Sequence, residues 1–180
     1  MIEICELCGT PVGAKHAHVA DTGGRRLLCA CRACFLAFTH DSRYRAVPER
    51  YLWDPGRPIT GIDWELLDTP AASAFFLRRG FQVTGFYPSP AGATECLLSP
   101  GFWGRLTVRH PLVTAAEPDV EAILLHKTAR GTDCFLVPID MCYRLVGTVR
   151  RHWTGLDGGR RMRARVDELF AEIKGRARPV

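Results

Sequence analysis

Two pairs of closely spaced cysteines near the start of the chain are the residues best suited to chemistry. Two residues separate Cys5 from Cys8, and two separate Cys31 from Cys34. A Cys-x-x-Cys pair bends two thiolates onto one ion, and two such pairs complete the four-ligand shell that is typical of structural zinc. Gly9 follows Cys8 and suits a metal-binding turn, because glycine tolerates a positive φ. The sequence therefore predicts one Zn²⁺ held by all four cysteines.

Iron is the alternative metal for the same four sulfurs. A rubredoxin-like iron site uses two nearly symmetric Cys-x-x-Cys-Gly turns, and the first pair with Gly9 has this form. The second pair is followed by Phe35, and the residues after it have the pattern of a helix. This difference favours zinc over an iron-based electron-transfer site.

Three further residues in the same segment offer ligands of similar kinds: His16, His18 and Cys29. If Gly23-Gly24 forms a two-residue hairpin loop, His18 lies opposite Cys29 and His16 lies opposite Cys31, with paired Cβ atoms about 5 Å apart. Three interpretations stay open: ordinary surface histidines, imidazoles that hydrogen-bond the zinc thiolates, and ligands of an additional metal. The strand register decides between them, and a sequence does not fix it to one residue.

The elements around the cysteines must bring the two pairs together. Residues 14–20 and 25–30 are predicted as the strands of a hairpin around the turn-forming run 21–24. Residues 31–38 have the pattern of the first turns of a helix. A metal-binding turn, a hairpin, and a helix whose first turn carries the second pair resemble the order in GATA-type and related treble-clef zinc fingers. This resemblance implies a scaffold and no particular function.

The rest of the chain is long enough for a domain with its own core. Of the 180 residues, 47% are hydrophobic and 24% are charged, as in soluble globular proteins. We predict an α+β protein: a treble-clef-like zinc-binding module over residues 1–46, a proline-rich linker over 47–61, an α+β domain with a mostly antiparallel sheet over 62–174, and a tail over 175–180.

Within the larger domain the sequence predicts two strand pairs and several helices. The strands are expected over 74–79 with 82–87 and over 120–127 with 134–137, and the prolines of 88–92 are expected to break the first pair. Helices are expected over 98–109, after an N-cap at Asp140, and over 160–174.

The charge distribution bears on the class of partner. Residues 144–180 carry ten basic and four acidic side chains, and such an excess can indicate nucleic acid. However, 21 of the 24 basic residues are arginines spread over the whole chain, which indicates a general preference for arginine. A nucleic-acid partner is therefore not expected.

Cysteine usage and hydropathy indicate a cytoplasmic protein without a membrane partner. The first ten residues lack the apolar segment of a signal peptide, and no apolar run reaches the roughly 20 residues that cross a bilayer. In a reducing compartment clustered cysteines are typical metal ligands. The scattered Cys96, Cys134 and Cys142 are expected to be buried packing residues.

No catalytic motif stands out. The nucleophile elbow, the phosphate-binding loop, the dinucleotide glycine pattern and the HExxH zinc motif are all absent from the sequence. We therefore predict no catalytic residues; the sequence favours a protein that is not an enzyme but leaves an activity of the larger domain open.

Several sequence blocks together resemble an uncharacterised bacterial family whose genes lie in operons for uptake nickel–iron hydrogenases. The blocks are Cys5-Glu6-Leu7-Cys8-Gly9, His16-x-His18, Leu28-Cys29-Ala30-Cys31-x-x-Cys34, Phe86-Tyr87-Pro88-Ser89-Pro90 with Gly92-Ala93-Thr94-Glu95, Leu136-Val137-Pro138-Ile139-Asp140, Cys142-Tyr143, Leu145-Val146-Gly147 and Trp153-x-Gly155-Leu156. They span nearly the whole chain. Cys96 departs from the pattern, since a small polar residue is expected there.

The resemblance implies a non-catalytic zinc-binding accessory protein that assists hydrogenase maturation or assembly through protein contacts. Its expected partner is a hydrogenase subunit or another maturation factor. Two alternatives from other classes are an iron-binding rubredoxin-like electron-transfer protein and a zinc-finger regulator that binds nucleic acid. The regulator would lose affinity steeply with salt, because phosphate contacts release counterions.

Overall fold

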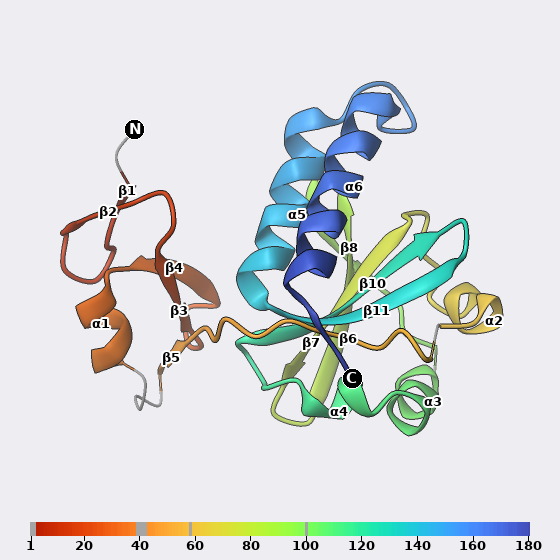
Figure 1. Ribbon diagram of the computed structural model, residues 1–180, viewed down its shortest axis with the longest axis horizontal. Helices are drawn as coiled ribbons and strands as arrows, with labels where there is room; N and C mark the ends of the chain where they lie inside the picture. Colours follow the sequence, from red (N-terminus) through yellow and green to blue (C-terminus); the bar gives the residue numbers. More distant parts are fainter. Residues whose placement is uncertain (1–2, 39–42, 58, 100) are drawn as a thin grey trace. The chain divides into compact units, whose positions relative to one another are not determined.

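The computed structural model describes residues 3–38, 43–57, 59–99 and 101–180 (Figure 1). The chain divides into two compact units, Met1–Glu49 and Arg50–Val180. Both units combine helices with strands that pair almost entirely in antiparallel fashion. The predicted α+β class with a mostly antiparallel sheet is confirmed.

The first unit is built on a small antiparallel sheet. Its three strands lie in the order β4-β3-β5. The elements of this unit are β1 (Glu3–Ile4), β2 (Pro11–Val12), β3 (Ala17–Asp21), β4 (Arg26–Ala30), α1 (Arg32–Ala37) and β5 (Tyr44–Ala46). Among the described residues of this unit, the buried apolar side chains are those of Cys5, Val19, Ala20, Leu28, Ala30 and Val47. So few apolar side chains make a marginal core, and units of this size commonly depend on a metal for stability.

A buried aspartate holds the turn between β3 and β4. Asp21 accepts hydrogen bonds from the Gly24 N–H at 2.9 Å and from Arg43 Nε at 3.1 Å. The bonds from Arg43 and then from Gly24 lower the pKa of this carboxyl, so the buried group stays charged. The loop spans residues 22–25 and is therefore longer than the glycine pair from which the register was predicted.

The second unit is organised around a seven-stranded sheet. The strand order is β12-β6-β11-β10-β7-β8-β9, and only the β12–β6 pairing is parallel. The strands are β6 (Leu52–Trp53), β7 (Ser73–Arg79), β8 (Gln82–Ser89), β9 (Gly92–Cys96), β10 (Glu121–Thr128), β11 (Gly131–Pro138) and β12 (Arg178–Pro179). The helices are α2 (Gly61–Glu65), α3 (Phe102–Arg109), α4 (Pro111–Ala115), α5 (Ile139–His152) and α6 (Gly159–Arg176).

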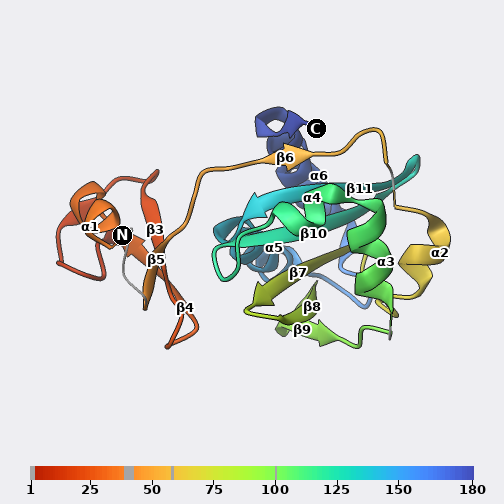
Figure 2. The ribbon, with the colours of Figure 1, turned by 90° about the horizontal axis from the view of Figure 1, so that it is seen from below.

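Helices cover both faces of this sheet. On one face, Ala122 and Leu124 of β10 belong to the cluster formed with α5 and α6, which lie side by side in Figure 1. On the other face, Ile123 and Leu125 pack in a cluster with α2, α3 and α4; in Figure 2, α3 and α4 lie in front of the strands and α5 lies behind them. Because both faces are buried, residues 122–125 of β10 are an uninterrupted apolar run and do not alternate with polar residues.

Strand β8 extends into the proline-containing run 88–92, at which the sequence predicted that the strand would end. It continues through Pro88, which pairs with Ala93 of β9, whereas the ladder to β7 already stops at Phe86. At Pro88 the strand therefore has a neighbour on one side only, and a proline without an N–H is tolerated there.

Short strands also occur in the ranges predicted as linker and tail. Strand β6 lies within 47–61 and pairs with β11, while β12 lies within 175–180 and pairs with β6. β6 pairs with Phe135 and Leu136 at the edge of β11, and β12 in turn pairs with the outer edge of β6, which reduces the number of unpaired backbone groups. Helix α5 begins at Ile139, so Asp140 lies in its first turn and does not act as the N-cap.

A buried histidine makes the stability of the second unit depend on pH. His126 Nδ1 lies 2.9 Å from Ser73 Oγ, and its ring stacks on Phe170 with centroids 3.7 Å apart. Burial lowers the pKa of His126 below its ordinary value of 6.5, and Asp167 only partly opposes this effect. The contribution of His126 to the free energy of unfolding is therefore fully present well above pH 6.5. It is lost as the pH falls through 6.5 toward the lower pKa of the folded state, because the unfolded chain takes up the proton first.

The measurement is urea unfolding followed by tryptophan fluorescence at pH 7.5 and 5.5, since all four tryptophans lie in the second unit. We expect the wild type to lose up to about 1 kcal/mol between these two pH values through His126. His126→Phe keeps an aromatic ring against Phe170 and should show a smaller loss. An equal loss in both proteins would contradict the assignment to His126.

Candidate metal centre

The first cysteine pair lies in a tight turn between β1 and β2. The Cys5 N–H donates to the Thr10 carbonyl at 2.8 Å, and the Gly9 N–H donates to the Cys5 carbonyl at 2.8 Å. Gly9 has a φ of +77°, the conformation for which glycine was predicted at this position. The turn thereby holds the sulfurs of Cys5 and Cys8 on the same side of the backbone bend.

The second pair lies at the start of α1, as the sequence predicted. Cys31 is the N-cap residue of this helix, and its sulfur accepts a hydrogen bond from the Cys34 N–H at 3.5 Å. The Phe35 N–H donates to the Cys31 carbonyl at 2.9 Å and begins the helical bonding. The first helical turn therefore presents both sulfurs from one short segment.

The structure brings all four predicted sulfurs together. Ligand atoms of Cys5, Cys8, Cys31 and Cys34 all lie within 4.8 Å of one another, and the Cys8 and Cys31 sulfurs are 3.7 Å apart. Zinc–sulfur bonds of about 2.3 Å in a tetrahedron separate the sulfurs by about 3.8 Å. The cluster therefore fits a tetrahedral ion, and both Zn²⁺ and iron meet this geometric condition.

The thiols of the four-cysteine cluster differ in acidity. Hydrogen bonds from Thr10, and then from the Cys5 and Cys34 side chains, lower the pKa of Cys8 to about 6. The hydrogen bond to Cys8 raises the pKa of Cys34 to about 12, with burial as the second cause. Without a cation, Cys8 thus loses its proton readily, whereas Cys34 keeps its proton. A divalent cation removes this competition and allows all four to ionise.

His16, His18 and Cys29 form a second group in the same unit. Their ligand atoms lie within 4.8 Å of one another, and the two imidazole centroids are 4.8 Å apart. The ladder pairs His18 with Cys29, as the predicted register required. It ends at Ala17, however, so His16 lies outside the strand and does not face Cys31 as a cross-strand pair.

The other three cysteines are remote from both groups in the sequence and are buried. Cys134 and Cys142 lie in the second unit under the apolar clusters, and Cys96 ends β9. Burial raises the pKa of Cys134 to about 12, so this thiol stays protonated. Within the described residues, the two groups in the first unit are the only sets of three or more His, Cys, Asp or Glu side chains close enough to hold a metal.

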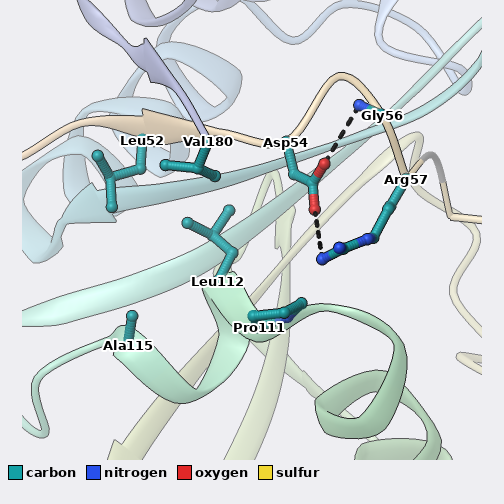
Figure 3. A pocket seen from close by; sticks show the side chains of 8 residues that line it. All are labelled: Leu52, Asp54, Gly56, Arg57, Pro111, Leu112, Ala115 and Val180. Atoms are coloured by element: carbon teal, nitrogen blue, oxygen red, sulfur yellow. Dashed lines mark hydrogen bonds and ion pairs between the residues drawn. The ribbon is translucent and has the colours of Figure 1, made fainter.

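The second unit contains a shallow hollow that sequence reasoning missed. Its volume is about 550 Å³, and Leu52, Leu112 and Val180 form its apolar wall. Figure 3 shows Asp54 at the polar end, where it accepts from the Gly56 N–H at 3.2 Å and pairs with Arg57 at 3.8 Å. The charges of this end are therefore balanced within the hollow.

A smaller hollow lies beside Arg57 and contains His110. This residue is buried, and its Nδ1 has no hydrogen-bond partner among the described residues. Burial lowers the pKa of His110, so the ring is neutral. Arg109 pairs with Asp63 at 3.0 Å, which again leaves no unbalanced charge. No spacing in the sequence connected His110 with these residues.

Comparison with protein families gives a match over most of the chain. A model described as a family of unknown function (DUF5947) matches residues 4–177, nearly the whole chain. No curated protein and no solved structure matches. Among the described residues, no helix combines the length and apolar character needed to cross a membrane.

Proposed function

We propose that this chain, which belongs to the family of unknown function DUF5947, is a non-catalytic zinc-binding accessory protein that assists the maturation or assembly of a nickel–iron hydrogenase through protein contacts. The observation that carries the proposal is the convergence of Cys5, Cys8, Cys31 and Cys34 from two separate elements onto one tetrahedral site. Four protein ligands close the shell of a zinc ion and leave no position for a substrate, which is typical of a structural site.

The local structure of the second pair supports zinc over iron. Cys31 caps a helix and Phe35 continues it, so the second pair does not form a glycine-containing turn like the first. The order of turn, hairpin and helix supports the treble-clef-like assignment. In this arrangement zinc ties the helix to the turn and stabilises a unit with a small core.

Two features support protein contacts rather than nucleic-acid binding. On the first unit, Ile4 and Leu36 expose about half of their surface, 52% and 56%. In the basic carboxy-terminal region, several cations are paired with acids of the same chain: Arg144 with Glu172, Arg163 with Asp157, Arg165 with Glu168 and Lys174 with Asp133. The hydrogenase as the assembled target is inferred from the resemblance of the sequence blocks.

The experiment is purification of a tagged chain, without oxygen, from cells that express a nickel–iron hydrogenase. We expect one tightly bound zinc per chain, no visible absorbance, and enrichment of a hydrogenase subunit or maturation factor over an untagged culture. Cys5→Ser should lose both zinc and partner, whereas Cys142→Ala, a buried thiol outside the cluster, should keep both. A red iron-containing protein would favour electron transfer, and a zinc protein that enriches no such partner would overturn the accessory role.

A further inference from the structure

His16, His18 and Cys29 have the geometry of a second metal site, separate from the four-cysteine cluster. Their side chains come from β3, from β4 and from the segment just before β3. All three ligand atoms lie within 4.8 Å of one another. None of the three residues belongs to the four-cysteine set, so the proposed structural zinc does not use them as ligands.

The orientation of His16 points to a ligand. Its Nδ1 lies 2.8 Å from the Gly13 carbonyl and 3.4 Å from Glu3 Oε2, and both oxygens can only accept. Nδ1 therefore carries a proton, and in the neutral tautomer with this proton the lone pair is on Nε2. The side chain is only 8% exposed, and Nε2 is buried with no hydrogen-bond partner among the described residues.

This arrangement is the one that metal-binding histidines adopt. A ligating imidazole usually donates its other N–H to a carbonyl or carboxylate, which fixes the ring and increases the basicity of the free nitrogen. A buried acceptor without a partner is unfavourable, and coordination of a cation would give Nε2 the partner that it lacks. Hydrogen bonding of Nε2 to a cysteine sulfur, the competing role for this ring, has no support in the contacts.

Cys29 supplies a thiol in an anionic environment. Its N–H donates to Glu6 Oε2 at 2.7 Å, and its carbonyl accepts from the Glu6 N–H at 2.9 Å. The nearby carboxylates of Glu6 and Glu3 attract a divalent cation. Glu6 also lies between Cys5 and Cys8, so the first cysteine turn holds Cys29 in place.

We propose that His16, His18 and Cys29 bind a second metal ion, a divalent late first-row transition metal, in a three-ligand site with one coordination position open. Two imidazoles and one thiolate match the ligand preference of ions such as Co²⁺, Ni²⁺ and Zn²⁺ and not that of Mg²⁺ or Ca²⁺. Three protein ligands leave room for water or an external donor. The ion in this site is therefore more exchangeable than the one in the closed four-cysteine site.

This site goes beyond the proposed accessory function and is tested by metal binding alone. The probe is Co²⁺, added to protein that carries one zinc per chain, followed by thiolate-to-cobalt absorbance and by counting both metals after gel filtration. We expect one cobalt per chain with the zinc retained. The matched variants are Cys29→Ser and His16→Gln, which should weaken cobalt binding by at least about tenfold while keeping the first zinc. His152→Asn, in the second unit, should bind as the wild type does.

A second measurement needs no variant. Imidazole nitrogen NMR of the wild type should show cobalt-induced broadening of His16 and His18 at the first equivalent, with the histidines of the second unit unchanged. Saturation at zinc alone, cobalt that only displaces zinc, or equal cobalt affinity in the wild type and in Cys29→Ser would each overturn the proposal. None of these outcomes depends on whether a protein partner is captured.

Discussion

Replacing Cys5 by serine is expected to abolish tight zinc binding and to unfold the first unit. Cys5 is the most buried of the four ligands, and backbone hydrogen bonds from Cys31, Leu7 and Cys8 lower the pKa of its thiol against the opposing effect of burial. Structural zinc contributes about 10–16 kcal/mol of apparent binding free energy in small zinc-finger peptides. A unit with so small a core is not expected to stay folded without it.

The measurement combines metal content after dialysis against a weak chelator with amide hydrogen exchange. We expect less than about one tenth of a zinc per chain and loss of protection in β3 and β4, because binding and folding are coupled. Tryptophan fluorescence, which reports on the second unit alone, should be unchanged. Cys142→Ala serves as the control and should keep one zinc. A Cys5→Ser protein with a full equivalent of tightly held zinc would contradict the assignment.

The second large effect is expected from Arg50→Met in the second unit. Arg50 donates to the fully buried Glu121 through Nε at 2.8 Å and Nη2 at 2.6 Å, and Nη2 also reaches the Ala115 carbonyl. Removing one partner of a buried pair typically costs 3–5 kcal/mol. The Arg50 side chain is 39% exposed and water can partly replace it, so we expect a loss of about 3 kcal/mol in the free energy of unfolding.

Urea unfolding by tryptophan fluorescence measures this loss. Arg144→Met is the matched control, because Arg144 also makes two short bonds to one carboxylate, but this carboxylate, that of Glu172, is 42% exposed whereas Glu121 is fully buried. Exposed pairs contribute about 0–1 kcal/mol. Adding Glu121→Gln to Arg50→Met removes the unpaired buried charge and should recover part of the loss. Equal effects of the two arginine substitutions would show that burial of Glu121 does not decide the energy.

The sequence by itself determined the features that depend on local spacing. Cys5 and Cys8 fall in one tight turn and Cys31 and Cys34 in one helical turn, because two intervening residues bring both sulfurs of a pair to the same side of the backbone. The register of His18 against Cys29 followed from the turn residues between their strands. The two long strand pairs followed from apolar, aromatic and β-branched runs on either side of turn-forming residues, and helices α5 and α6 followed from the helical spacing of apolar residues.

Only the tertiary structure decided which distant segments meet. β6 and β12 carry too few residues to show a period; β6 became a strand because β11 offered an edge, and β12 because β6 offered the next one. Arg50 and Glu121 are far apart in the sequence, and only the packing of the second unit brings them together. Likewise, no pattern in the sequence predicted that the Gly13 carbonyl would bond His16 Nδ1 and that Nε2 of the same ring would be buried without a partner. Backbone geometry determines how residues close in the sequence are placed. The contacts between distant segments depend on the packing of the whole unit, which a short stretch of sequence does not determine.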